Sequence, residues 1–183
     1  MQKTDLSKFD NAWYNPGNPL KRGLWFFVNV CVMQNRMNPF NGSRIFFLKI
    51  FGAKLGSGVV IKPNVNIKYP WKLEIGNNVW VGEKVWIDNL GEVKIGDNVC
   101  LSQGAMLLCG NHNYKKVEFD LVVGDITLEE GVWIGAHSVV CPGVSCKSHS
   151  ILSVNSVAVK ILEPYTIYQG NPAVEVRKRE FKD

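Results

Sequence analysis

Three six-residue stretches set the pattern of this chain: IGNNVW at residues 75–80, VGEKVW at 81–86 and IGDNVC at 95–100. Each begins with an aliphatic residue and has a small or branched apolar residue four positions later. The same spacing starts at Leu55 and continues as far as Ala158. A six-residue unit is too short for a helix pair or a hairpin, but it fits one short strand and one corner. Three units then make one coil of a parallel β-helix, and each coil adds about 4.8 Å.

The aliphatic positions fall on three sides of the predicted solenoid. Departures from six-residue spacing follow only the third side: two extra residues after Ile67, two after Ile87 and fifteen after Leu107. Random irregularities would not share one corner, so we predict about five coils in this register, with a long loop at 108–127 projecting from that corner. Side one holds Leu55, Ile75, Ile95, Leu128 and Cys146; side two holds Ile61, Val81, Leu101, Ile134 and Leu152; side three holds Ile67, Ile87, Leu107, Val140 and Ala158.

The segments on either side of the repeat have different patterns. We expect residues 1–54 to form an arm and helices, 55–160 the β-helix, and 161–183 a tail that includes a short helix within 175–182, all in one structural domain. Apolar residues at helical spacing predict a helix over Leu20–Met37, which Asn38-Pro39 ends. A second helix is predicted over Arg44–Phe51, with Ser43 as its cap and Gly52 closing it.

The central apolar run of the helix predicted over Leu20–Met37, Leu24–Met33, is far shorter than the ~20 residues needed to span a bilayer. We expect it to pack on the domain or on a neighbouring subunit. The alternative is an interfacial membrane helix, since Trp25 and Phe26 are flanked by basic residues. Outward-facing tryptophans on the solenoid, Trp80 and Trp133 on one side and Trp86 on the next, also require a cover or a ligand.

The composition is that of an ordinary soluble protein, with 46% hydrophobic and 20% charged residues. The net charge of +5 suits an anionic ligand but identifies none, and we expect no nucleic-acid partner. The five cysteines form no C-x-x-C pair, and the first residues do not resemble a secretory signal. We therefore expect reduced thiols and a cytoplasmic protein, with peripheral contact at the inner face of the membrane as an alternative.

The strongest candidate for catalysis is His112, since it lies in the only long insertion of a rigid scaffold. Histidine titrates nearest working pH, as a general base requires. His137 and His149 fall at corner positions, where a structural role is the simpler interpretation. The three histidines show no local spacing typical of metal ligands, so we expect no metal site. The sequence also lacks a nucleophile elbow, a P-loop and a dinucleotide-binding glycine motif.

Four features together resemble the hexapeptide-repeat acyltransferases: the repeat, the loop with Asn111-His112, GVWIG at 131–135 and PYTIYQGNPA at 164–173. Within these enzymes the chain resembles the maltose and galactoside acetyltransferase group. The N-terminal part is similar to the colanic-acid biosynthesis acetyltransferases, in WY at 13–14, KRG at 21–23 and LKIFGAKLG at 48–56. The resemblance implies a left-handed parallel β-helix, a homotrimer with active sites in clefts between subunits, and acetyl-CoA as co-substrate without a required metal.

The resemblance also implies roles for individual residues. His112 would be the general base that takes the proton of a sugar hydroxyl. The resemblance indicates no group that orients it, and Asp120 and Glu118 are candidates because they lie in the same loop. The chain departs from the family at Ser153, Cys146 and Val174, and the last of these bears on phosphate binding. The acceptor would be bound by Asn111, Asp88 and Asn89, and the backbone amide of Ala136 would donate to the oxyanion. Trp133 would flank the pantetheine arm of CoA. The rest of the CoA site would be lined by Val154, Ala158 and Lys160, with Arg177 near the nucleotide phosphates.

The function implied is an acetyl-CoA-dependent O-acetyltransferase that acts on a saccharide hydroxyl in surface-polysaccharide biosynthesis. Its acceptor would be a free saccharide, a sugar nucleotide or a lipid-linked sugar. Two alternatives belong to other classes: a metalloenzyme like the γ-class carbonic anhydrases, and a non-catalytic β-helix that serves as an assembly subunit. Both have the repeat in common with the acyltransferases, because the repeat specifies a fold and no activity.

Overall fold

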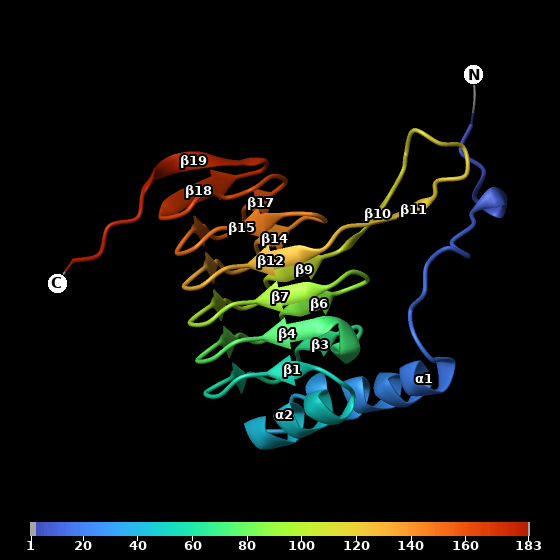
Figure 1. The fold of residues 1–183 in the computed structure, drawn as a ribbon, viewed down its shortest axis with the longest axis horizontal. Coiled ribbons are helices and arrows are strands. Elements are labelled where there is room, and N and C mark those ends of the chain that lie inside the picture. The colour runs from blue at the N-terminus through green and yellow to red at the C-terminus, as the bar shows by residue number, and fades with distance from the viewer. Residues whose placement is uncertain (1–2, 183) are drawn as a thin grey trace.

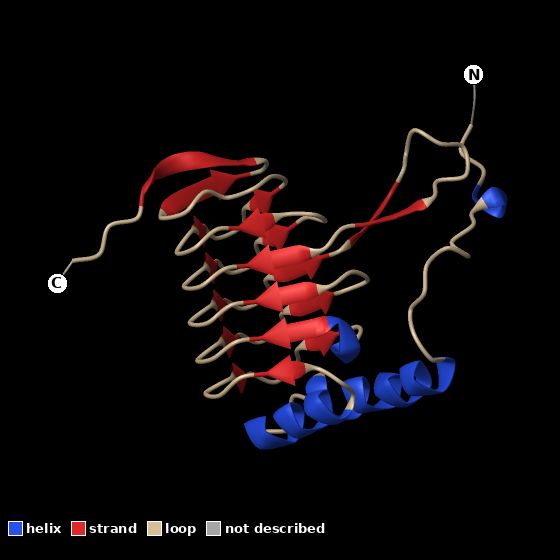
Figure 2. Ribbon diagram, viewed as in Figure 1, coloured by secondary structure: helices blue, strands red, loops and turns tan. Residues whose placement is uncertain are grey.

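The computed structural model describes residues 3–182 and shows a parallel β-helix with helices across one end and a β-hairpin across the other (Figure 1). Three sheets form its sides (Figure 2). The side-one sheet contains β1 (Lys54–Leu55), β4 (Leu73–Ile75), β7 (Val93–Ile95), β12 (Ile126–Leu128) and β15 (Ser145–Cys146). The side-two sheet contains β2 (Val60–Ile61), β5 (Trp80–Val81), β8 (Cys100–Leu101), β13 (Trp133–Ile134), β16 (Ile151–Leu152) and β18 (Thr166–Gly170). The side-three sheet contains β3 (Asn66–Ile67), β6 (Trp86–Asp88), β9 (Met106–Leu108), β14 (Val139–Val140) and β17 (Val157–Ala158).

The strand pairing confirms the predicted register on all three sides. On side three, for example, Ile67 pairs with Ile87, Ile87 with Leu107, and Leu107 with Val140. These side chains point inward and are fully buried. Five coils are complete, and a sixth is partial, because Leu162 bridges to Cys146 and β18 pairs with β16.

The corners of the coils require an unusual backbone conformation at several positions. Asn78, Asn98, His137 and His149 all have positive φ angles between 55° and 59°. Asparagine and histidine occupy this left-handed region more readily than most residues. His137 and His149 therefore have a structural reason to stand at these corners.

The N-terminal helices differ from the predicted ones at their ends. Helix α1 (Pro19–Val28) continues into a π-helical turn, η2 (Asn29–Met33), so the helical segment ends before Met37. Helix α2 (Asn41–Ile50) begins before Ser43, whose hydroxyl donates to the carbonyl of Phe40. The arm is also not wholly extended, because Leu6–Lys8 form a 3₁₀ turn, η1. A second 3₁₀ turn, η3 (Pro70–Lys72), lies within the solenoid between β3 and β4.

Side chains from these helices cover the open edge of the first coil. The indole Nε1 of Trp25 donates to the carbonyl of Ile67, at 2.8 Å, and Nε of Arg44 donates to that of Ile61, also at 2.8 Å. Arg44 is buried, and this desolvation lowers its pKa. The helices thus satisfy edge carbonyls that would otherwise invite pairing with another chain.

The last coil is closed by a hairpin, where we had predicted a helix within 175–182. Strand β19 (Ala173–Lys178) pairs antiparallel with β18 and extends the side-two sheet. Ala173 is buried and the rest of β19 is exposed, so backbone pairing with β18, after the Gly170-Asn171-Pro172 turn, holds the strand in place. Within residues 3–182, no helix is both long enough and apolar enough to cross a membrane.

Candidate active site

A β-hairpin carries His112 away from the solenoid. Strands β10 (Gly110–His112) and β11 (Leu121–Val123) pair antiparallel, with His112 opposite Leu121. The hairpin leaves after β9 on side three and returns before β12 on side one, so it projects from the corner between those sides (Figure 1). The histidine therefore stands clear of the coils from which it emerges.

One carbonyl and two rings hold the imidazole of His112. Its Nδ1 lies 2.9 Å from the carbonyl oxygen of Phe119, and its ring stacks on that of Phe119 with centroids 4.4 Å apart. The ring of Phe9 approaches from the N-terminal arm, with a centroid distance of 5.8 Å. A carbonyl oxygen accepts only, so Nδ1 carries the proton and Nε2 retains its lone pair. This is the tautomer that a general base acting through Nε2 requires.

The orienting group is the backbone of Phe119, which sequence reasoning did not identify. Neither Asp120 nor Glu118 orients the ring through Nδ1, because the Phe119 carbonyl occupies that position. Asp120 instead pairs with Lys116, at 2.8 Å between Oδ2 and Nζ. Phe119 has a φ of +56°, a conformation that bulky residues rarely adopt. Every residue has a carbonyl, so the sequence carries no signal for this contact.

The N-terminal arm braces the hairpin and its base. The N–H of Asp5 donates to the carbonyl of Val117 in the hairpin loop, at 2.9 Å. The hydroxyl of Tyr14 donates to the carbonyl of Leu90, at 2.8 Å, and Nζ of Lys72 donates to the same oxygen. Burial chiefly raises the pKa of Tyr14, so its hydroxyl remains a donor. The arm therefore helps to fix where His112 stands, which the sequence did not reveal.

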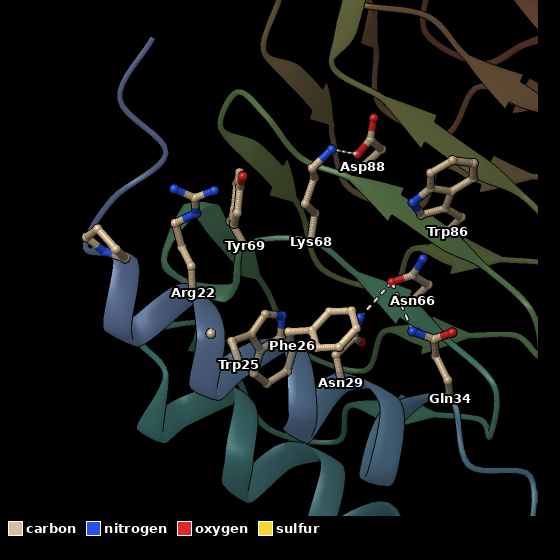
Figure 3. Close-up of a pocket in the computed structure, with 12 residues that line it drawn as sticks. Arg22, Trp25, Phe26, Asn29, Gln34, Asn66, Lys68, Tyr69, Trp86 and Asp88 are labelled. Atoms are coloured by element: carbon tan, nitrogen blue, oxygen red, sulfur yellow. Dashed lines mark hydrogen bonds and ion pairs between the residues drawn. The ribbon is translucent and has the colours of Figure 1, made fainter. Parts of the chain in front are cut away.

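A pocket of about 590 Å³ lies between α1 and the side-three edge of the first coils (Figure 3). Arg22 and Phe26 of α1 form one wall, and Lys68, Tyr69 and Trp86 contribute to the other. Its lining combines aromatic rings with polar groups, a combination suited to a small polar ligand.

Asp88, one of the predicted acceptor-binding residues, lines this pocket. Its Oδ1 lies 2.9 Å from Nζ of Lys68, as Figure 3 shows, and its side chain is 16% exposed. Its Oδ2 is 3.9 Å from the position that a Cβ on Gly110 would take. Since Gly110 begins the strand that bears His112, Asp88 lies between the pocket and the base of the hairpin.

The two predicted asparagines have different surroundings. Asn89 is fully buried, and its amide both donates to the carbonyl and accepts from the N–H of Tyr69, at 2.6 and 2.9 Å. An acceptor molecule cannot reach it, and it instead joins two coils, so we leave it out of the proposed site. Asn111 is exposed, and its Oδ1 accepts from the N–H of His112, at 2.8 Å. Asn111 thus remains available beside the histidine.

The predicted donor-site residues Trp133 and Arg177 lie on the outer face of the side-two sheet. They border a groove of about 550 Å³ with Ile151, Ile167 and Phe181. The indole Nε1 of Trp133 donates to the hydroxyl of Ser102, at 2.9 Å, which fixes the ring orientation. An outward-facing column leads to this groove: Val60, Trp80, Cys100, Trp133, Ile151, Ile167 and Arg177.

Ala136 and Val154 stack at the next corner, between sides two and three. The N–H of Asn155, beside Val154, donates to the carbonyl of Ala136, at 2.9 Å. The N–H of Ala136 donates no hydrogen bond to any part of the chain that the structure describes. The same is true of Glu83 and Gln103 at this corner in lower coils, so the free donor belongs to the corner and does not by itself mark a site.

Ala158 and Lys160 complete the predicted set. Ala158 faces the core and is 1% exposed, so only its backbone is open to a ligand. Lys160 is exposed at the corner between sides three and one, where it lines a hollow of about 530 Å³ with Glu163 and Glu175. The donor-site candidates thus occupy side two, side three and two different corners, and one chain does not gather them around His112.

No cluster of three or more histidine, cysteine or acidic side chains placed to hold a metal occurs within residues 3–182.

No family model matches the chain. A relative from Escherichia coli (strain K12), named as the colanic acid biosynthesis acetyltransferase WcaF, is 35% identical over 176 residues, which is 96% of this chain and 97% of that protein.

Solved structures have the same fold at lower identity. A hexapeptide-repeat acetyltransferase from Vibrio cholerae O1 biovar eltor, solved in complex with acetyl coenzyme A, matches with a TM-score of 0.79 at 20% identity, over 88% of each chain. A maltose O-acetyltransferase from Clostridium difficile 630 matches with a TM-score of 0.76 at 19% identity, over 90% of each chain. These matches confirm the predicted left-handed parallel β-helix.

Proposed function

The chain belongs to the hexapeptide-repeat acetyltransferases, with acetyl-CoA as co-substrate, and from this premise we propose that it acetylates a saccharide hydroxyl with His112 as the general base. The observation that carries the proposal is the imidazole on the hairpin, whose Nδ1 is tied to a carbonyl and whose Nε2 has no hydrogen-bond partner within residues 3–182. The name of the relative from Escherichia coli supports surface-polysaccharide biosynthesis as the setting.

In the proposed reaction, Nε2 of His112 takes the proton of the acceptor hydroxyl as its oxygen attacks the thioester carbonyl carbon. The contact between Nδ1–H and the carbonyl of Phe119 stabilises the imidazolium that forms. A backbone N–H, with Ala136 as the candidate, donates to the tetrahedral oxyanion. Collapse of this intermediate breaks the carbon–sulfur bond, and the imidazolium returns its proton to the leaving CoA thiolate. The products are the acetyl ester and CoA, and the histidine regains its starting state.

We place the acceptor in the pocket beside α1, with Asp88 of its lining as one binding group and Asn111, which lies beside His112 on the hairpin, as the other. Saccharides are bound through aromatic faces and polar side chains, and Trp86 and Tyr69 together with Lys68 and Asp88 provide both. The position of Asp88 near Gly110 would bring a bound hydroxyl toward the hairpin.

We further propose that the donor site forms between copies of the chain in a homotrimer. The side-two groove with Trp133 and Arg177 lies on a different side from the corner that carries the His112 hairpin. A second copy that sets its side-two face beside this hairpin would unite the base with the donor groove. Val154, Ala158 and Lys160 stay as candidate CoA contacts, Ala158 through its backbone alone.

The role of His112 is tested by acetyl transfer from acetyl-CoA to a panel of saccharides. We expect His112→Ala to lower kcat by about 10²–10⁴-fold, the usual contribution of a general base. His137→Asn is the matched control, because asparagine also tolerates the left-handed corner, and it should retain the wild-type rate. Equal rates for His112→Ala and wild type would remove the histidine from its proposed role.

Co-assembly of two inactive variants tests the shared site. His112→Ala lacks the base, and Trp133→Ala is expected to weaken donor binding. If each site draws these groups from two copies, refolding the variants together at equal amounts should restore about a quarter of the wild-type rate, since the copies assort at random. Mixing without any recovery, in particles shown to contain both variants, contradicts a site shared in this way.

A further inference from the structure

Helices α1 and α2 are apolar on the faces that point away from the solenoid. Trp25, Asn29 and Met33 are the buried positions of the first helical segment. The opposite face bears Leu20 and Phe27, exposed by 72% and 66%, where a surface helix normally has polar residues. Further exposed apolar residues extend this surface along α1, across the connecting loop and onto α2: Leu24, Phe26, Val30, Met37, Phe40, Phe46 and Ile50.

These exposed apolar residues form one continuous surface, because both helices lie across the same end of the β-helix (Figure 1). We call this surface the helical cap. Trp25 bonds to the first coil on side three and Arg44 on side two, so the inward faces of both helices are held against the solenoid. On an ordinary monomer, exposed apolar side chains are scattered singly, whereas here they gather on one surface.

The charge around the cap has a single sign. From Asn11 to Ala53 the sequence contains no Asp or Glu, while Lys21, Arg22, Arg36 and Lys49 are basic residues outside the core. None of these four forms an ion pair within the part of the chain that the structure describes. Lys21 has its Nζ 4.8 Å from the centroid of the Trp71 ring and Arg22 lines the pocket, so the exposed Arg36 and Lys49 supply the charge at the border of the cap. An apolar face with basic groups at its border matches a surface with apolar and anionic character together.

We propose that the helical cap docks on the surface of an anionic lipid bilayer. The helical segment of α1 and η2 is 10 and 5 residues long, about 22 Å at 1.5 Å per residue, whereas a bilayer core is about 30 Å thick. The cap therefore lies in the interface and does not span it. A second copy is the less favourable occupant, because face-to-face pairing brings two basic borders together, whereas anionic headgroups complement them.

Docking would place the acceptor pocket next to the bilayer. Arg22 and Phe26 belong to α1 and also line the pocket. Because Phe26 belongs to both, the pocket opens directly beside the edge of the cap. If the proposed function holds, this arrangement favours a lipid-linked saccharide as acceptor. The docking itself does not depend on the activity.

Vesicle flotation of the full-length protein tests the docking. Vesicles of phosphatidylcholine with added phosphatidylglycerol should bind the wild type, and vesicles of phosphatidylcholine alone should bind it more weakly. We expect Phe27→Glu/Phe46→Glu to lower the partition coefficient at least about tenfold on anionic vesicles. Val176→Glu is the matched control, since Val176 is also exposed but lies on β19 at the opposite end of the solenoid, and it should bind as the wild type does.

Charge reversal gives a second variant if the first fails to fold. Arg36→Glu/Lys49→Glu should reduce binding to anionic vesicles and leave the weak binding to neutral vesicles unchanged. Wild-type protein that does not float with anionic vesicles, or apolar variants that float as well as wild type, would overturn the proposal. So would a lower particle mass for Phe27→Glu/Phe46→Glu in lipid-free solution, because a second copy would then cover the cap. His112→Ala should float normally, so a failure of the proposed catalysis remains distinguishable.

Discussion

In the solenoid, Ile87 pairs with Ile67 below and Leu107 above, and all three side chains are fully buried. On the hairpin, His112 is half-buried and held by the carbonyl of Phe119 and by two rings. The solenoid repeats one contact many times, whereas the hairpin depends on a few contacts made once. Changes in the coils should therefore affect stability, and changes around the hairpin should affect the reaction.

The largest effect is expected from a cavity in the coils. Ile87→Ala removes a fully buried side chain between two ladder neighbours, and it should lower the free energy of unfolding by about 2–5 kcal/mol. Chemical denaturation measures this change. Val122→Ala on the hairpin strand β11 is the matched control, and for this half-exposed residue we expect less than about 0.5 kcal/mol. Equal losses of unfolding free energy for the two variants would contradict the proposed difference between coil and hairpin.

A clash at a corner should cost less than a cavity in the core. A Cβ added at Gly82 would stand 2.8 Å from the backbone nitrogen of Gln103 in the next coil. Gly82→Ala should therefore destabilise the protein by about 1–3 kcal/mol, because the neighbouring backbone must shift. A melting temperature equal to that of the wild type would mean that the coils separate more easily than their packing indicates.

The arm offers a change that should affect rate and not stability. Phe9→Ala removes one of the rings beside His112, and we expect kcat to fall about tenfold, because a loosely held base is misplaced in the transition state. The melting temperature should stay within the error of the wild-type value. Leu6→Ala, at another exposed position of the arm, is the control with an unchanged rate. A rate unaffected by Phe9→Ala would show that Phe119 alone holds the ring.

The smallest expected effect is on the pH dependence of stability, through a carboxylate in the coils. The N–H of Asn77 donates to Asp97 in the next coil, and this bond chiefly lowers the pKa of Asp97. A lowered folded-state pKa contributes stability above the unfolded pKa of about 4, and this is lost as pH falls through the folded value. Asp97→Asn should therefore flatten the fall in melting temperature on the acid side slightly. Wild-type and variant curves that remain parallel below pH 4 would assign no role to this carboxylate.

Much of the fold could be predicted from the repeat, because the position of each residue in its six-residue unit determines whether its side chain faces the core. Aliphatic residues at fixed spacing must face one core, and all three predicted sides pair as assigned. The predictions for the segments outside the repeat were less accurate. Residues 175–178, predicted as part of a helix, belong to strand β19, because pairing with β18 outweighs a weak local preference.

The candidate site was read only in part. His112 stood out because one long insertion interrupts a regular scaffold, and Asp88 does line a pocket near the base of that insertion. Asn89 is enclosed by its bonds to Tyr69, although it neighbours Asp88 in sequence. Adjacent residues on a strand or corner point to opposite sides, so sequence proximity did not indicate shared accessibility.

By itself, the sequence determined the solenoid, its register and the corner from which the histidine projects, because periodic burial of apolar side chains leaves one consistent arrangement. Only the tertiary structure decided the tautomer of His112, its bracing by Phe9 and the arm, and the apolar cap on the side away from the coils. The tautomer follows from a carbonyl seven residues away in the same hairpin, and the other features arise from contacts between segments far apart in the chain. A backbone carbonyl at Phe119 and the outward face of α1 depend on how the whole chain packs, and no local pattern encodes that packing.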